Sequence, residues 1–168
     1  LYDCCPFSDG GSAIILASEE KAKKLTNKPV YVVGVGQASA GNLLSQKEYL
    51  PRLRSRELAA EQAYKMAGLT PKDIDVIELH DCFSIATIVA LDSLGFFEYG
   101  KSGEAVEKGE TKLGGKIPVN PSGGLKAKGH PIGATGTAQV YEIVRQLRGE
   151  CGERQVEGAK VGMADTLG

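Results

Sequence analysis

Alternating apolar and polar stretches along the chain predict helices and strands in turn. Apolar positions recur with a helical period between 56 and 68, where Gly68 can end the helix, and again between 140 and 147. Short runs of β-branched and other apolar residues favour strands. Because strands alternate with helices, we expect an α/β layered fold with a mixed or mostly parallel sheet flanked by helices. The predicted strands cover 12–18, 29–40, 75–79 and 116–120.

Four further segments complete this pattern. Ser18 is a plausible N-cap for a short helix whose acidic start and basic end suit the helix dipole. Residues 83–97 are apolar on nearly every face, so 83–94 is predicted to be a central helix that is buried all round. The polar, glycine-containing stretch 101–115 is predicted to be a long surface loop. The last apolar run, "AKVGMADTLG", indicates a strand with nothing after it to pair.

Composition and charge exclude some classes of function. The 168 residues carry a formal net charge of −1 and show no cluster of Lys and Arg, so nucleic acid is not an expected partner. No apolar stretch approaches the ~20 residues of a membrane span. Four cysteines without framework spacing favour free thiols and a cytoplasmic protein. The chain opens like mid-domain sequence, so we expect it to be a fragment of a longer polypeptide. The cysteines are Cys4, Cys5, Cys82 and Cys151.

The tetrapeptide "HDCF", residues 80–83, places an imidazole, a carboxylate and a thiol at a predicted strand-to-helix junction. Unsatisfied backbone N–H groups and the helix dipole favour a thiolate or an oxyanion at such a junction. The alternative interpretation is that His80 and Asp81 cap the helix while Cys82 packs as a small apolar side chain. The tetrapeptide alone leaves both interpretations open.

A second candidate site lies in the glycine-rich segment 120–137, "NPSGGLKAKGHPIGATGT". Its glycines allow a close approach of backbone to a ligand, and Pro131 stiffens the turn that carries His130. A flexible connecting loop is the plain alternative. The segment lacks the order of a phosphate-binding loop, and "GVGQAS" at 34–39 lacks the third glycine of a dinucleotide fingerprint. His80, Cys82 and His130 have no evident fourth ligand, so we predict no metal site.

Taken together, these motifs resemble the C-terminal half of a thiolase. The resemblance rests on "DG" at 9–10, "HDCF", "NPSGG…GHPIGATG" and the closing "GMADTLG", and it covers essentially the whole chain. The "HDCF" tetrapeptide resembles the sterol-carrier-protein-type subfamily, which includes archaeal-type acetoacetyl-CoA thiolases. The resemblance implies a thiolase-like layered fold. Residues 1–27 would be the tail of the N-terminal domain, and 28–168 the C-terminal domain without its final strand.

The same resemblance implies a chemistry and a role for each residue. Thiolases transfer acyl groups between acyl-CoA thioesters, by Claisen condensation of acetyl-CoA or thiolysis of 3-oxoacyl-CoA, as part of lipid metabolism. His130 would activate the nucleophile and line an oxyanion hole, and His80 would supply the other oxyanion site. Cys82 would be the catalytic acid/base, because the usual C-x-G motif reads Thr166-Leu167-Gly168 here. We therefore expect His80, Cys82 and His130 to converge on one cleft.

The expected ligand is coenzyme A or its acyl thioester, bound as substrate, and no cofactor is expected. The nucleophilic cysteine of the family lies in the N-terminal half, so we expect the isolated chain to be inactive and to need that half as its partner. The full-length enzyme is expected to be a homo-oligomer. The alternatives are a thiolase-like aldolase or a non-catalytic subunit that completes a site with another chain. The substrate-binding positions implied are Cys5, Phe83, Gly129 and Gly168.

Overall fold

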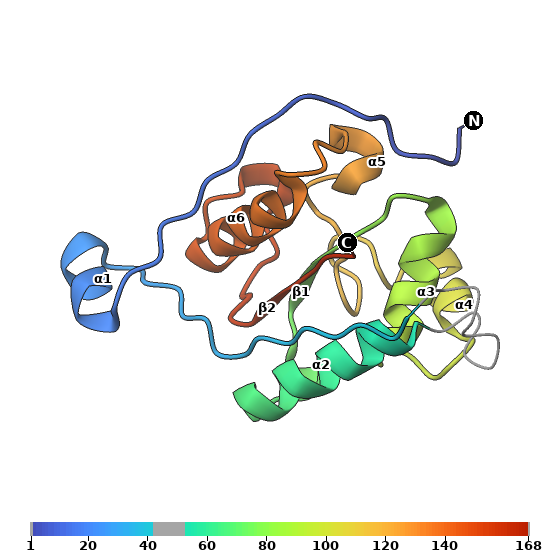
Figure 1. The fold of residues 1–168 in the computed structure, drawn as a ribbon, viewed down its shortest axis with the longest axis horizontal. Helices are drawn as coiled ribbons and strands as arrows, with labels where there is room; N and C mark the ends of the chain where they lie inside the picture. Colours follow the sequence, from blue (N-terminus) through green and yellow to red (C-terminus); the bar gives the residue numbers. More distant parts are fainter. Residues whose placement is uncertain (1, 42–52, 168) are drawn as a thin grey trace.

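A short parallel sheet of two strands lies between helices in the computed structural model, which describes residues 2–41 and 53–167 (Figure 1). Helix α6 packs on both strands, while α2 and α3 pack on each other and α4 packs on α3. Single 3₁₀ turns cover Pro71–Asp73 and Gly152–Arg154. The helices and strands are α1 (Glu19–Leu25), α2 (Arg54–Ala67), β1 (Val76–Leu79), α3 (Ser84–Leu94), α4 (Ser102–Glu107), α5 (Gly124–Lys128), α6 (Thr135–Arg148) and β2 (Gly162–Asp165).

The sheet pairs β1 with β2 in parallel, with Val76 opposite Gly162. This pairing confirms the predicted strands at 75–79 and in the closing apolar run, which lie side by side. The strand predicted at 116–120 is reduced to a single bridge. The N–H of Ile77 donates to the Pro118 carbonyl at 3.1 Å, and the Asn120 N–H donates to the Ile77 carbonyl at 2.8 Å.

Alternation along β1 divides the core between the two faces of the sheet. Ile77 and Leu79 point toward α2 and α3 and join the larger buried cluster, whereas Val76 packs with Ile143 of α6 and Val156. Glu78 is on the same side as Val76 and has no exposed surface. The strand is therefore buried on both faces, as parallel sheets require. The larger cluster contains Ala60, Ile77, Leu79, Ala90, Leu91, Leu94, Phe96 and Ile117.

Helices α1 and α2 confirm the sequence predictions at one end each, and α6 confirms the predicted last helix. The Ser18 hydroxyl accepts a hydrogen bond from the Lys21 N–H and caps α1. Helix α2 ends at Gly68 in the left-handed conformation (φ 67°), and α6 ends in the same way at Gly149 (φ 74°). Local periodicity and capping signals thus determine these elements.

The strands predicted at 12–18 and 29–40 are wrong for this chain. Both segments are extended in the structure without being strands, and Ile15 and Val32 are 91% and 69% exposed. A β-rich sequence becomes a strand only when another strand satisfies its backbone groups, and within the described residues neither segment is placed in a sheet. The second segment instead passes close to α2, where a Cβ built on Gly36 would lie 1.8 Å from the Ala59 carbonyl oxygen.

Helix α3 forms as predicted, but it is not buried all round. Its C-terminal half packs in the core through Ala90, Leu91 and Leu94, whereas Ile85 is 57% exposed and Ile88 is half-buried. A two-stranded sheet with the neighbouring helices encloses only one end of an 11-residue helix. The expectation of complete burial was therefore wrong for the first two turns.

The surface loop predicted at 101–115 contains helix α4. The Ser102 hydroxyl donates to the Asp92 carboxylate at 2.5 Å, and Ser102 and Ala105 are buried against α3. On the outer face, Glu104 pairs with Lys108 at 2.7 Å, one helical turn away. The prediction of a loop was thus wrong for 102–107, whose polar residues form the solvated face of a short helix, and holds for 108–115, which contains no helix or strand.

Candidate active site

The junction between β1 and α3 carries the first group of candidate residues. His80 and Asp81 are buried and Cys82 is half-buried, just before α3 begins at Ser84. Asp81 accepts a hydrogen bond from the Leu125 N–H at 2.7 Å, at the start of α5. Asp81 therefore fastens the glycine-rich segment to this junction and does not cap α3. Asp3, from the N-terminal segment, accepts a hydrogen bond from the Ser84 N–H instead.

The glycine-rich segment is held in place by close backbone contacts. The Asn120 side chain accepts from the Leu79 N–H at 2.7 Å, and Asn120 adopts a positive φ of 50°. A Cβ on Gly124 would lie 2.3 Å from the Asp81 carboxylate, and one on Gly129 (φ 88°) would lie 2.5 Å from the Ser8 hydroxyl. These glycines are needed because a side chain at either position would separate segments that must touch.

The two histidines of the chain meet at this point. The rings of His80 and His130 are perpendicular, with centroids 4.9 Å apart. Both rings are buried, and Nδ1 of His130 lies 2.8 Å from the hydroxyl oxygen of Thr135. Burial lowers the pKa of His80, and the neighbouring His130 lowers it further because two positive imidazoles would repel each other. His80 is therefore a neutral imidazole at pH 7.

An extended N-terminal segment joins the two parts of the site. The Cys5 N–H donates to the Cys82 carbonyl at 2.9 Å, and the His130 N–H donates to the Pro6 carbonyl at 2.9 Å. The Phe7 ring stacks on the His130 ring with centroids 6.4 Å apart. Burial, and secondarily the nearby Cys5 thiol, raise the pKa of Cys82. The Cys82 thiol is therefore protonated at neutral pH.

A buried ion pair links α2 to the end of β2, next to the strand that leads into the junction. The Arg56 guanidinium of α2 lies 3.0 Å from the Asp165 carboxylate at the end of β2, and both side chains are buried. The Gln139 side chain of α6 donates to the Asp165 carbonyl at 3.0 Å. Nδ1 of His80 is buried and has no hydrogen-bond partner among residues 2–41 and 53–167. The charges of Arg56 and Asp165 act on the pKa of His80 in opposite directions.

Most of the residues predicted from sequence thus lie together. Backbone contacts with the Cys4–Phe7 segment place Cys82 and His130 beside it, and the ring contact places His80 beside His130. Phe83 is half-exposed and pairs with Cys4 at the start of α3. Gly168 lies outside the described residues.

Several residues of this site were not identified from sequence. Thr135 and Arg56 gave no signal, because a threonine or an arginine in an amphipathic helix is ordinarily solvated. The tight "NPSGG" turn could have indicated Asn120, since asparagine tolerates positive φ. Asp3 precedes its partner by 81 positions, and no local pattern links them.

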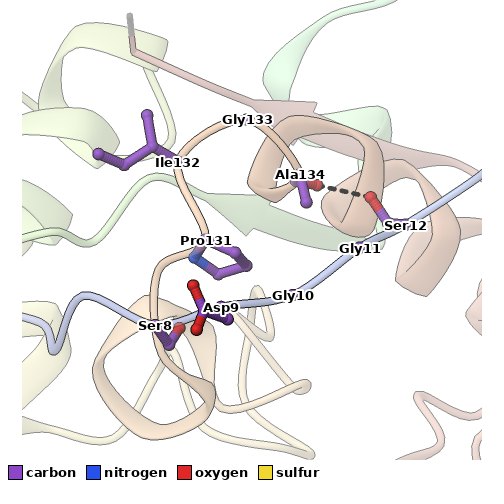
Figure 2. Close-up of a pocket in the computed structure, with 9 residues that line it drawn as sticks. All are labelled: Ser8, Asp9, Gly10, Gly11, Ser12, Pro131, Ile132, Gly133 and Ala134. Atoms are coloured by element: carbon purple, nitrogen blue, oxygen red, sulfur yellow. Dashed lines mark hydrogen bonds between the residues drawn. The ribbon is translucent and has the colours of Figure 1, made fainter.

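A pocket of about 430 Å³ opens between residues 8–12 and residues 131–134, which directly follow His130 in the chain (Figure 2). The Ser12 hydroxyl donates to the Ala134 carbonyl at 2.7 Å and ties the two strips together. The lining is largely backbone and small side chains, which is suited to an extended, partly polar chain. Across 2–41 and 53–167, no three His, Cys, Asp or Glu side chains are grouped so that they could hold a metal ion.

No described helix has both the length and the apolar character needed to cross a bilayer.

Comparison with known families gives a match over most of the chain. The family described as "Thiolase C-terminal domain-like" matches residues 36–168. The acetyl-CoA acetyltransferase of Methanothermobacter thermautotrophicus is 54% identical over 168 residues, which are all of this chain and 44% of that relative. Sterol carrier protein 2 of Oryctolagus cuniculus is 46% identical over 173 residues and is covered to 32%. The chain therefore spans less than half the length of these curated relatives.

Among solved structures, an Ltp2-ChsH2(DUF35) aldolase is similar, with a TM-score of 0.77 and 25% identity. The match covers 87% of this chain and 38% of the aldolase chain. The α/β layered architecture predicted from the sequence is confirmed by this likeness together with the family match.

Proposed function

The chain belongs to the thiolase C-terminal domain-like family, and on that premise we propose that it is the C-terminal half of an acyl-CoA C-acyltransferase. The observation that carries the proposal is the perpendicular contact of His80 and His130 beside the Cys82 loop. The whole protein, meaning a protein that contains this chain and a part matching the remaining length of the curated relatives, would condense acetyl-CoA or cleave 3-oxoacyl-CoA. We propose that it acts in lipid metabolism, in the cytoplasm and as a homo-oligomer.

The chemistry of acyl transfer explains why these residue types belong together. A thiol nucleophile needs a base, the thioester oxygen needs hydrogen-bond donors as it gains negative charge, and the acetyl methyl group must lose a proton. In the proposal, His130 accepts the proton of the nucleophile and lines one oxyanion site. His80 serves the other oxyanion site. A neutral, buried imidazole suits this role, because it can donate one hydrogen bond without a competing water shell.

Cys82 is the proposed acid/base for the α-proton of acetyl-CoA. Its raised pKa keeps the thiol protonated before substrate arrives, which is the form required to return a proton to the leaving carbanion. In the opposite direction a base must first remove that proton, and we propose that one of the two imidazoles assists. We propose that the nucleophilic cysteine lies outside this chain, in the remaining part of the whole protein.

Coenzyme A thioesters are the proposed substrates, and no cofactor is invoked. The strips 8–12 and 131–134 would accommodate the pantetheine arm in the pocket between them (Figure 2). Cys5, whose N–H donates to the Cys82 carbonyl, Phe83 at the start of α3 and Gly129 beside His130 are the proposed contacts near the thioester. Gly168 is proposed on resemblance alone.

The test compares this chain with the whole protein. Thiolysis of acetoacetyl-CoA should be absent from the chain alone, because no nucleophile is assigned to it, and present in the whole protein. There, Cys82→Ala should abolish exchange of the acetyl-CoA methyl protons while the acyl-enzyme still forms, whereas His130→Ala should slow both steps by about 10²–10⁴-fold. Cys4→Ala is the matched control, since Cys4 is an exposed thiol in the segment that crosses the site.

Methyl exchange that survives Cys82→Ala at the normal rate would contradict the role given to this thiol. Activity of the chain alone would contradict the placement of the nucleophile elsewhere.

A thiolase-like aldolase is the second candidate, and the similar structure of the Ltp2-ChsH2(DUF35) aldolase favours it. An aldolase cleaves a 3-hydroxyacyl thioester and needs no acyl-enzyme. Incubating the whole protein with radiolabelled acetyl-CoA separates the two: covalent label on the protein supports acyl transfer. Retro-aldol cleavage without any covalent label would favour the aldolase.

A further inference from the structure

Thr135 is the first residue of α6 and is almost completely buried. Its hydroxyl oxygen lies 2.8 Å from Nδ1 of His130 and 3.1 Å from the carbonyl oxygen of Pro131. The Thr135 N–H also donates to that carbonyl at 3.0 Å, so the carbonyl is fixed against the first turn of the helix. One hydroxyl therefore stands between a ring nitrogen and a carbonyl, in a place where water is excluded.

Only one placement of the protons makes a hydrogen bond of both contacts of the Thr135 hydroxyl, the one with His130 and the one with Pro131. A hydroxyl has a single proton to donate, and a carbonyl oxygen can only accept. Thr135 must therefore donate to Pro131, and Nδ1 of His130 must bring its own proton to the Thr135 oxygen. In the reverse arrangement the Pro131 carbonyl would still accept from the N–H groups of Ala134 and Thr135, at 2.8 and 3.0 Å, but its oxygen and the hydroxyl oxygen would lie 3.1 Å apart with lone pairs facing each other, a repulsive contact that the first arrangement avoids.

We propose that Thr135 is a positioning residue that holds neutral His130 in the tautomer protonated at Nδ1, so that Nε2 carries the lone pair. The catalytic consequence rests on the proposed function of the site. When the nucleophile is activated, its S–H bond breaks, the electron pair stays on sulfur and the proton forms an N–H bond at Nε2. The products are a thiolate and an imidazolium whose two N–H groups are both donors.

The need for such a residue follows from the chemistry of imidazole. Free neutral histidine favours the tautomer protonated at Nε2, and in that form the nitrogen left to face the nucleophile could only donate. The hydrogen bond made by one ring nitrogen selects the state of the other. In this site the Thr135 hydroxyl oxygen therefore accepts the hydrogen bond from the ring N–H that a carboxylate or a backbone carbonyl accepts from other catalytic histidines.

The test is direct because the chain has only two histidines. The ¹⁵N shifts of the imidazole nitrogens, measured at a pH of about 8, report which nitrogen of His130 is protonated, and His80→Gln assigns the signals. We expect Nδ1–H in the unaltered chain and in Thr135→Ser, which keeps the hydroxyl. Thr135→Val keeps the shape without the hydroxyl and should shift His130 to the Nε2–H tautomer.

Thr137→Val is the matched control, because it removes a hydroxyl from the same helix at a half-buried position. It should leave the His130 signals unchanged. An Nε2–H signal for His130 in the unaltered chain would overturn the proposal. So would an unchanged tautomer in a Thr135→Val variant that keeps its thermal unfolding temperature.

Kinetics in the whole protein provide an independent measurement. Acyl-enzyme formation should fall about tenfold in Thr135→Val, since the productive tautomer becomes the minor one, and should recover in Thr135→Ser. A normal rate in Thr135→Val would overturn the proposed consequence for catalysis. If the expected tautomers are observed but the unaltered whole protein never forms an acyl-enzyme, the tautomer assignment stands and the proposed function fails.

Discussion

Glu78 is a buried carboxylate on β1 that the proposed chemistry does not use. It accepts hydrogen bonds from the N–H and the hydroxyl of Ser122, at 3.0 and 2.6 Å, and lies 3.7 Å from the Lys128 ammonium. Burial nevertheless raises the pKa of Glu78, and the carboxylate of Glu142 on α6 raises it further. Glu78 therefore fastens the "NPSGG" turn to the sheet at an electrostatic cost.

This cost predicts a pH dependence of stability. A raised pKa means that the folded chain keeps the Glu78 proton at pH values where the unfolded chain has lost it, so stability falls as the pH rises above the ordinary value of 4.5. Urea unfolding of Glu78→Gln should show a smaller loss of unfolding free energy between pH 4.5 and 7 than the unaltered chain.

Glu104→Gln is the control with the opposite sign. Hydrogen bonds from lysines hold the pKa of the exposed Glu104 carboxyl below its usual value. The stability that this carboxylate contributes is therefore lost as the pH falls. If the unfolding free energy of Glu78→Gln fell with pH as steeply as that of the unaltered chain, the raised pKa assigned to Glu78 would be contradicted.

At the scale of elements, the extended segment 29–40 and helix α2 touch through glycine. A Cβ on Gly36 would lie 1.8 Å from the Ala59 carbonyl oxygen, and one on Gly34 would lie 2.4 Å from that of Ala63. These atoms are backbone, so they cannot move aside cheaply. The two glycines of "GVGQAS" at 34–39, which begin like a dinucleotide fingerprint, are thus explained by the close packing of residues 29–40 on α2.

Gly36→Ala should accordingly destabilise the chain by about 1–3 kcal/mol or more, the usual cost of overpacking. Gly11→Ala is the control, since a Cβ there meets nothing within 4 Å, and its effect should stay within about 0.5 kcal/mol. Chemical denaturation measures both. Equal stability of the two variants would show that α2 can move away from the segment.

Helix α3 provides a second comparison within one element. Leu91 is completely buried, so Leu91→Ala should cost about 2–5 kcal/mol, whereas exposed Ile85→Ala should change stability by less than about 0.5 kcal/mol. The same denaturation experiment applies. A large loss for Ile85→Ala would mean that the first turns of α3 are covered in solution.

These elements show what the sequence can and cannot predict. Helices α1, α2 and α6 follow from local periodicity and caps, since each helix satisfies its own backbone. The strands at 12–18 and 29–40 could not be settled locally, because a strand exists only with a partner. The candidate site has the same limitation: the meeting of His80 and His130, fifty positions apart, followed from the resemblance, and no local pattern indicated Thr135 or Arg56.

At the scale of the whole molecule, the chain leaves apolar surface uncovered. Ile15 and Leu16 in the first extended segment, and Val32, Val33 and Val35 in the second, are each more than half exposed. The N-terminal segment runs along the outer side of α5 and α6 before reaching α1, and the chain then returns past α2 (Figure 1). Exposed β-branched runs of this kind are a hazard unless another segment pairs with them.

The remaining part of the whole protein is the expected cover for these segments, because the chain spans only 44% of the archaeal relative. Hydrogen exchange tests this directly. Backbone amides within 13–17 and 30–35 should exchange quickly in the chain alone, since none is placed in a described helix or strand. In the whole protein they should become protected by pairing. Amides in the middle of α6 are the internal control and should be protected in both. If the two segments exchange equally fast in the whole protein, they are not sheet strands there, and the site must be completed by contacts elsewhere.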